Sequence, residues 1–284
     1  YALTQALRRS GAYQAMLVGL LSLNFGILFF DRNALNFLMP FVKPDLGLTD
    51  TQIGMLSSGL SLTWAIAGFA VGRLSDKLGS RKPIIVLGTI AFCLCSVISG
   101  VAASFLMLLG ARILMGAAEG GVMPVSHSII VAEVDEKHRG LAMGVAQNLG
   151  SNVLGSAVAP LVLIPIAVAY GWRDGFFLAA IPGFISAAII WFVIKEPEVR
   201  APQADDKPVP SLKEAFADRN VQLCSLISIL LVSYLVVCWA FMPLYLTEQR
   251  GFDPDKVKWL MATLGISAGI GSFAVSSLSD YIGR

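Results

Sequence analysis

Eight long apolar stretches divide this chain of 284 residues, and only four ionisable residues lie well inside them. The four are two acids and two bases, namely Asp31, Arg32, Arg112 and Glu119. A charge within a lipid bilayer is costly, so ionisable residues in spanning helices usually face an interior cavity and mark the path of an ion or a substrate. The pattern therefore predicts a membrane transporter.

Each apolar stretch is long enough to cross a bilayer, which requires about 20 mostly apolar residues. The predicted spanning helices are residues 13–39, 51–72, 83–103, 105–131, 141–168, 175–195, 221–246 and 257–279. The composition agrees, because 56% hydrophobic and only 14% charged residues are far from the values of a soluble domain. We therefore expect an all-α protein that crosses the membrane several times.

The segment between the sixth and seventh stretches differs from the other connections. It holds four prolines among many charges, which is typical of a linker. We predict a bundle of six helices over residues 1–195, a cytoplasmic linker over 196–220 and the first two helices of a second bundle over 221–284. With the N-terminus in the cytoplasm, the cytoplasmic segments hold fourteen basic residues against five outside. Basic residues gather on the cytoplasmic side, so the count favours this orientation.

The two predicted bundles share short sequence patterns. Residues 74–76 and 278–280 both read Leu-Ser-Asp, and Gly47 is matched by Gly251, in each case 204 positions later. Parallel repeats of six helices, with the substrate bound between them near the middle of the membrane, are a standard plan of secondary transporters. We expect the chain to cover about eight of twelve such helices.

Residues 72–82 read Gly-Arg-Leu-Ser-Asp-Lys-Leu-Gly-Ser-Arg-Lys and match the pattern G-x-L-x-D-x-x-G-x-R-[RK] at every fixed position. This loop resembles the signature loop of the major facilitator superfamily, and residues 276–284 hold a weaker copy. The resemblance implies a role in gating for Gly72, Asp76, Gly79, Arg81 and Asp280. The glycines allow close packing and a tight turn, and Asp76 can meet the positive N-terminus of a neighbouring helix. A loop that only fixes the topology is the alternative.

Two further motifs resemble the anion:cation symporter family within that superfamily. Residues 30–35 read Phe-Asp-Arg-Asn-Ala-Leu and are similar to its N-Y-x-D-R-x-x-L motif, although Leu28 and Phe29 replace the Asn and Tyr. Residues 112–121 place an arginine before several small residues, as the second motif of the superfamily does. The resemblance implies transport of organic anions such as sugar acids.

The four intramembrane charges suggest a path for a proton. Arg112 and Glu119 are two helical turns apart on one face, about 10 Å along the axis. Asp31 and Arg32 are expected near the level of Arg112, so Asp31, Arg112 and Glu119 could pass a proton inward in that order. Arg32 offers a planar fork that fits a carboxylate. The alternative is a pair of internal salt bridges that only hold the helices together.

The fifth stretch carries a polar stripe, and aromatic residues elsewhere could complete a pocket. The predicted substrate-binding residues besides Arg32 are Gln147, Asn148, Ser151, Asn152, Trp64 and Tyr234. Polar contacts that only join helices are the alternative for the stripe. For the aromatic residues the alternative is a position facing lipid.

We therefore expect a major facilitator fold and proton-coupled symport of a small organic carboxylate, a sugar acid or an aromatic acid. The expected partners are the organic anion, protons and the bilayer, without nucleic acid, in a monomer of a bacterial inner membrane. A proton gradient would drive transport, and neither a cofactor nor a metal is expected. An enzyme is disfavoured, because neither a nucleophile–base set nor metal-ligand spacing occurs. A multidrug:proton antiporter and a non-transporting membrane receptor remain alternatives.

Overall fold

The computed structural model describes residues 10–197 and 216–282, without the side chains of Asp76 and of residues 272–282. Regular structure in this part is helical throughout. The first group of helices is α2 (Gly11–Leu46), α3 (Asp50–Leu78), α4 (Lys82–Gly100), α5 (Phe105–Gly120), α6 (Val122–Glu133), η1 (Glu136–His138), α7 (Arg139–Gly144), the π-helical η2 (Val145–Leu149) and η3 (Ser151–Val158), α8 (Ala159–Tyr170) and α9 (Trp172–Val193). The second group is α11 (Arg219–Leu244), the π-helical η4 (Tyr245–Gln249) and α12 (Pro254–Ile282).

All eight predicted stretches coincide with these helices, except that residues 101–103 and 194–195 lie beyond the ends of α4 and α9. Seven candidate spans in the described part are long and apolar enough to cross a membrane, with α5 and α6 forming one span and η1 through α8 another. The eighth stretch lies in α12, whose side chains are described only as far as Gly271. Most of the predicted linker lies outside the described residues, so the division into two bundles at 195 and 221 stays a prediction.

Short turns reverse the chain after α2 and after α3. Gly47 and Gly79 end α2 and α3 with φ angles of 60° and 66°, a backbone conformation that glycine adopts without steric cost. Thr49 then begins α3 with a capping box, because its hydroxyl accepts from the Gln52 N–H and the Gln52 side chain accepts from the Thr49 N–H. Helices α2 and α3 therefore run antiparallel. We call the two ends of the molecule the Gly47 end and the Gly79 end.

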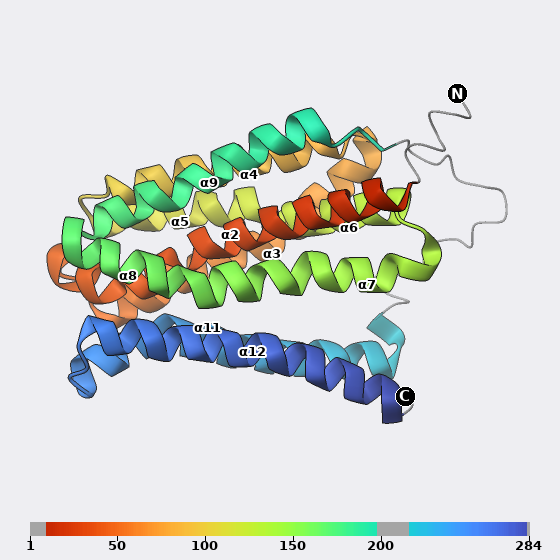
Figure 1. Ribbon diagram of the computed structural model, residues 1–284. Helices are drawn as coiled ribbons and strands as arrows, with labels where there is room; N and C mark the ends of the chain where they lie inside the picture. The colour runs from red at the N-terminus through yellow and green to blue at the C-terminus, as the bar shows by residue number, and fades with distance from the viewer. Residues whose placement is uncertain (1–9, 198–215, 283–284) are drawn as a thin grey trace.

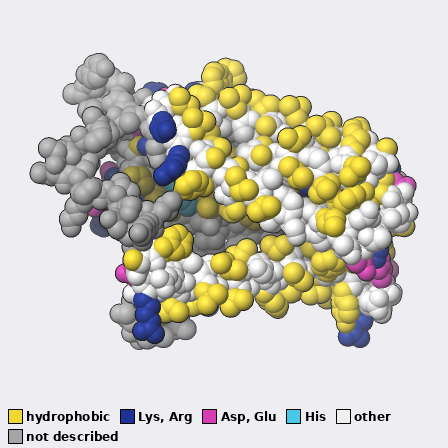
Figure 2. Space-filling view, turned by 180° about the vertical axis from the view of Figure 1, so that it is seen from behind, with side chains coloured by type: hydrophobic (Ala, Val, Ile, Leu, Met, Phe, Trp, Pro, Cys, Tyr) yellow, Lys and Arg dark blue, Asp and Glu magenta, His cyan; other side chains and the backbone are white. Residues whose placement is uncertain are grey.

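Helices α2 to α9 form one body, and α11 and α12 form a second layer along it (Figure 1). Within the body, α3 packs on α5 and α4 packs on α9, while α2 contacts η3, α8 and α9. The second layer joins the body through α12 on η3 and α8 and through α11 on α2. Figure 2 shows hydrophobic side chains over the middle of the surface and charged ones towards its ends, as expected of a surface that faces lipid.

Glycines set the closest helix contacts beside the buried charges. A side chain at Gly120 of α5 would collide with α3, because its Cβ would lie 2.8 Å from the Gly68 nitrogen. A Cβ at Gly116, one turn earlier, would overlap the Leu60 carbonyl of α3. Close approach of backbones through small residues is how membrane helices gain packing energy. Glu119 lies between these two glycines on α5.

Candidate transport site

Arg32 and Glu119 form an ion pair inside the body. Nη1 of Arg32, on α2, lies 3.6 Å from Oε2 of Glu119, on α5. The Glu119 side chain is fully buried, whereas the Arg32 side chain keeps 17% of its surface exposed. Neither carboxylate oxygen of Glu119 has a hydrogen-bond partner among the described residues. The pair is therefore a loose one, and its basic member has access to open space.

Two aromatic rings hold the Arg32 guanidinium. Its central carbon lies 5.3 Å from the ring centroid of Trp64 on α3 and 5.7 Å from that of Phe29, one turn earlier on α2. Both distances are within the range of a cation–π interaction. The structure thus brings Trp64 beside Arg32, and a role of the two in substrate binding stays a prediction. The indole N–H of Trp64 is buried and has no hydrogen-bond partner in the described part of the chain.

Asp31 faces a different neighbour from Arg32, because consecutive helical residues project about 100° apart. The fully buried Asp31 accepts a hydrogen bond from the Ser96 hydroxyl of α4 through Oδ1. The same Ser96 oxygen lies 3.2 Å from the Phe176 carbonyl of α9. Oδ2 of Asp31 has no hydrogen-bond partner among the described residues. Sequence analysis missed Ser96 and Phe176.

A signal for Ser96 was present in the sequence. Asn24 and Asp31 are seven residues apart on α2, and Thr89 and Ser96 are seven apart on α4. In the structure Asn24 bonds Thr89 as Asp31 bonds Ser96, each pair separated by 65 residues. Each of these two apolar helices carries two polar residues seven positions apart. That spacing indicated that the polar residues of one helix face those of the other.

Arg112 is nearly fully buried at 1% exposure, and its charge interacts with both Asp31 and Glu119. Its Nη1 donates to the Arg32 carbonyl and to the sulfur of Met115, each at 3.3 Å, and its guanidinium lies 5.5 Å from the Phe176 ring centroid. Its Nε and Nη2 have no hydrogen-bond partner among the described residues. Arg112 therefore interacts with the acids through space, and the ion pairs of the described part do not join it to Asp31.

The expected depth of the charges needs one correction. The Arg112 guanidinium reaches the Arg32 carbonyl, but the Arg32 guanidinium lies 3.6 Å from Glu119, which had been expected about 10 Å deeper. The estimate counted the rise of the helix alone and left out the length of the arginine side chain. The expected order Asp31, Arg112, Glu119 is therefore incomplete, because Arg32 is the immediate partner of Glu119.

The fifth predicted stretch departs from regular α-helix over the whole polar stripe. Residues 145–149 and 151–158 are π-helical, which changes the faces on which Gln147, Asn148, Ser151 and Asn152 lie. π-Helical turns are rare and often occur at functional sites. Ser151 donates to the Gln147 carbonyl of its own helix at 2.7 Å. Asn148 is exposed, and Gln147 and Ser151 are partly exposed.

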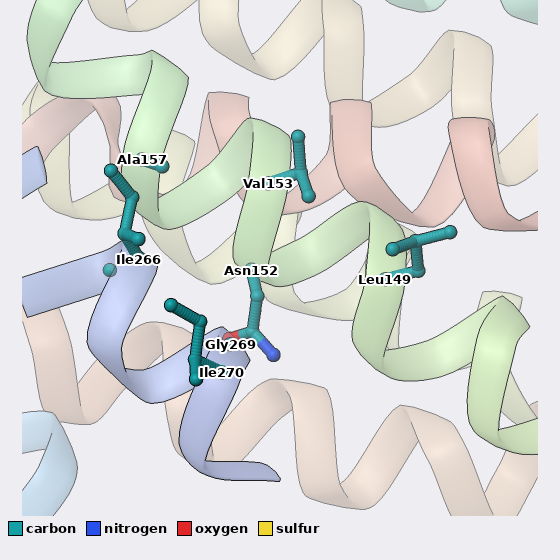
Figure 3. A pocket seen from close by; sticks show the side chains of 8 residues that line it. Leu149, Asn152, Val153, Ala157, Ile266, Gly269 and Ile270 are labelled. Carbon is teal, nitrogen blue, oxygen red and sulfur yellow. The ribbon is translucent and has the colours of Figure 1, made fainter. Parts of the chain in front are cut away.

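Asn152 is the polar residue of a cavity of about 270 Å³ between η3 and α12 (Figure 3). The lining residues are Leu149, Asn152, Val153, Ala157, Gly265, Ile266, Gly269 and Ile270. The lining is otherwise apolar, and the cavity contains none of the four buried charges. Arg32 is not among the lining residues of this cavity, so a substrate site shared by Asn152 and Arg32 stays a prediction.

Tyr234 was also predicted to line the substrate site. It is 67% exposed on α11, so nothing in the described part places it in a pocket. The candidate span that contains Tyr234 is only 6% buried, so an aromatic residue there faces lipid or another helix. Among the described residues, no three His, Cys, Asp or Glu side chains form a potential metal site.

The loop over residues 72–82 lies at the Gly79 end, away from the charges. Gly79 makes the predicted tight turn. A Cβ added to Gly72 would lie 3.8 Å from the Pro124 Cβ, so this glycine packs against α6. Arg81 donates to the Ser128 carbonyl of α6 at 2.9 Å, which ties the loop to a second helix. The side chains of Asp76 and Asp280 lie outside the described ones.

An acid that sequence analysis placed in the linker lies at the start of α4. The Glu196 carboxylate accepts from the backbone N–H groups of Arg81 and Lys82, at 2.5 Å and 3.1 Å. A carboxylate at a helix N-terminus satisfies unpaired donors and the helix dipole. We had expected Asp76 to serve such a helix end. The position of Glu196 directly after the sixth span was the available signal.

Comparisons with known proteins agree with this architecture. The chain is 26% identical over 283 residues to a probable sulfoacetate transporter of Cupriavidus necator, which covers 94% of this chain and 65% of that protein. It is 30% identical over 260 residues to a probable 4-methylmuconolactone transporter of Cupriavidus pinatubonensis, with 90% and 60% covered. A hexuronate transporter of Bacillus subtilis is 28% identical over 276 residues, with 89% and 61% covered. The chain thus spans about three-fifths of the length of these relatives.

A solved structure has the same fold. It is that of a bacterial homologue of the human lysosomal transporter Spinster in an inward-facing, unoccupied conformation, with a TM-score of 0.81. The identity is 24%, and the match covers 96% of this chain and 64% of that one. The family model described as Major Facilitator Superfamily matches residues 21–284, and the family and these relatives are transporters rather than enzymes. The chain is a multi-pass integral membrane protein and belongs to the Major Facilitator Superfamily.

Proposed function

We propose that this protein is a secondary transporter that moves a small organic carboxylate together with protons by alternating access. The observation that carries the proposal is the loose pair of Arg32 and Glu119. An arginine inside a membrane protein needs an anionic partner. This one has a buried carboxylate at 3.6 Å, part of its own surface exposed, and a guanidinium held by two rings. A substrate carboxylate that binds the Arg32 guanidinium through two hydrogen bonds is a better partner for it than Glu119 is.

The same pair supplies a reason for coupling to protons. Glu119 and a substrate carboxylate would compete for one guanidinium. If Glu119 takes up a proton, its attraction for Arg32 is lost and Arg32 is released for the substrate. A buried, desolvated carboxyl is the type of group that proteins use for such a task. We assign Arg32 to substrate binding, Glu119 and Asp31 to protonation, and Arg112 to the electrostatic link between them.

The relatives support an anionic substrate. Sulfoacetate and hexuronate, which appear in the names of two of them, both carry acidic groups that an arginine can bind. The sulfoacetate, 4-methylmuconolactone and hexuronate transporters are all from bacteria, which supports a bacterial inner membrane for this chain. The excess of basic residues supports a cytoplasmic Gly79 end and an outer Gly47 end. We further propose a monomer driven by the proton gradient without a cofactor.

Export of drugs is the second candidate. A multidrug resistance protein MdtL of Escherichia coli is 26% identical over 230 residues, with 81% of this chain and 58% of that protein covered. The fixed positive charge of Arg32 disfavours the binding of cationic drugs. Uptake in proteoliposomes separates the two candidates: a panel of sugar acids, aromatic acids and cationic drugs is offered with and without an inward proton gradient. Accumulation of an acid driven by the gradient supports symport, whereas drug efflux against protons without acid transport would replace our proposal by antiport.

A further inference from the structure

We infer that Ser96 is a positioning residue that transmits the protonation state of Asp31 from α2 to α9. This role rests on the proposed function and on the position of the Ser96 hydroxyl oxygen, which lies near two acceptors. The Ser96 oxygen is in hydrogen-bond contact with Asp31 Oδ1 and lies 3.2 Å from the Phe176 carbonyl oxygen. A serine hydroxyl has one hydrogen to donate and two lone pairs that accept. It therefore serves only one of these acceptors at a time.

The charge of Asp31 decides which acceptor receives the hydrogen. When Asp31 is ionised, its carboxylate is the stronger acceptor, so the Ser96 hydrogen points to Oδ1. When Asp31 is protonated, its own O–H donates to the Ser96 oxygen, and the Ser96 hydrogen turns to the Phe176 carbonyl. One proton is added at Asp31 and one hydrogen changes its acceptor. The result is a hydrogen bond between α4 and α9 that forms only when Asp31 carries a proton.

Two other buried serines of the body, Ser99 and Ser126, bond only within their own helix. Ser99, one turn further along α4, donates to the Cys95 carbonyl of its own helix at 2.9 Å. Ser126 likewise donates to the Val122 carbonyl of α6 at 2.7 Å. Such bonds back to the preceding turn are the usual way for a serine to satisfy itself within a membrane helix. Ser96 instead joins α2, α4 and α9, so its hydroxyl is committed to contacts between helices.

The surroundings contain the charges with which such a relay would act. The titratable groups that interact with Asp31 are Arg112 and Glu119 on α5 and Cys93 and Cys95 on α4, while Arg32 follows it on α2. Helix α9 contributes the Phe176 carbonyl to Ser96 and the Phe176 ring to the Arg112 guanidinium. Phe176 therefore contacts both Ser96, which bonds Asp31, and Arg112, whose charge interacts with both acids.

The test uses the full-length protein in proteoliposomes and three variants, Ser96→Ala, Ser96→Thr and Ser99→Ala. Ser96→Ala removes the donor to ionised Asp31, so Asp31 should hold its proton to a higher pH. The carboxyl C=O band of Asp31 in the infrared spectrum, identified as the band that Asp31→Asn removes, should titrate at least about one pH unit higher. The pH profile of gradient-driven carboxylate uptake should move in the same direction. Ser96→Thr keeps the hydroxyl and should restore both, and Ser99→Ala should change neither.

The two proposals fail separately. An Asp31 band that titrates in Ser96→Ala as in the wild type would overturn the role of Ser96, whatever the protein transports. An equal shift in Ser99→Ala would also overturn it, because that serine bonds only its own helix. A wild type that accumulates no carboxylate under a proton gradient would instead overturn the proposed symport. The infrared titration would in that case still measure the bond between Ser96 and Asp31.

Discussion

Nη1 of Arg32 lies 3.6 Å from Oε2 of Glu119, and the carboxylate is fully buried without a hydrogen bond among the described residues. A buried ion pair recovers its desolvation cost only when its geometry is good and its remaining polar atoms are bonded. This pair meets neither condition. It is therefore a poor structural contact, and its arrangement suits a pair that exchanges partners during a cycle.

The first prediction concerns the shape of the cation at position 32. Arg32→Lys keeps the charge but loses the planar fork and the stacking on two rings, so binding of the transported carboxylate should weaken about ten- to hundredfold. Calorimetric titration of the purified protein measures the loss. Arg173→Lys, which alters an arginine at the Gly47 end, is the matched control and should bind as the wild type does. Wild-type affinity in Arg32→Lys would remove Arg32 from the substrate site.

The second prediction separates coupling from binding at Glu119. Glu119→Gln imitates the protonated acid, so the variant should bind substrate and exchange it across the membrane. It should fail to accumulate substrate when a pH difference is applied, because the site no longer takes up or releases a proton. Counterflow and gradient-driven uptake are measured on the same preparation. Joint loss of binding and exchange would indicate a structural role, and retained accumulation would leave Asp31 as the remaining candidate for protonation.

The sequence predicted the helices and the cluster of charges because both depend on the bilayer. Long apolar runs must form helices in lipid, and ionisable residues within them must face inward. The pairing inside the cluster was not predictable in the same way. It depends on how far the Arg32 side chain reaches and on how closely Gly116 and Gly120 let α3 approach α5, and both are properties of packing.

Two other features of the structure were not predictable from the sequence, for a common reason. The polar stripe was placed with the period of an α-helix, whereas residues 145–149 and 151–158 are π-helical. Asn152 therefore lines a cavity with α12 that none of the four charges lines. Glu196 was predicted to begin the linker, and its contact with the start of α4 was not foreseen. Local backbone geometry and contacts between distant segments decided these cases, and periodicity along one segment reports neither.

The third prediction concerns the glycines beside Glu119. Gly120→Ala places a methyl group against the backbone of α3, which cannot yield as a flexible side chain does, so stability should fall by about 1–3 kcal/mol. Thermal unfolding of the detergent-solubilised protein should show a lower Tm together with weaker substrate binding. Gly110→Ala on the same helix is the matched control, because no atom lies within 4 Å of its added Cβ. Equal melting of the two variants would contradict the close α3–α5 contact.

A last relationship joins the two layers at the Gly47 end. The Lys43 ammonium on α2 bonds two acids, Glu248 of η4 at 2.8 Å and Asp50 of α3 at 2.9 Å. If the Gly47 end is the outer end, opening it moves η4 away from α2 and breaks the bond to Glu248. Asp50 stays beside α2 through the short turn at Gly47, so it keeps Lys43 paired when the molecule opens.

The two acids should therefore act in opposite directions on one equilibrium. Glu248→Gln removes an attraction made only in the closed form and should raise the ratio of open to closed molecules. Asp50→Asn makes Lys43 depend on Glu248 alone and should lower that ratio. Each change should be at most about fivefold and should shrink at high salt, because exposed ion pairs are weak and screened.

Electron–electron distance measurements between spin labels at Pro44 and Gln249, in a background without the native cysteines, measure the ratio. Asp45→Asn is the matched control, since Asp45 lies two residues beyond Lys43 but bonds Arg173 at 2.8 Å and Trp172 at 3.1 Å within the body. Both of its partners belong to α9, which packs on α2, so this contact does not cross to the second layer. Its loss should leave the distance distribution unchanged. Shifts of the same sign in Glu248→Gln and Asp50→Asn would show that Lys43 does not distinguish the two forms.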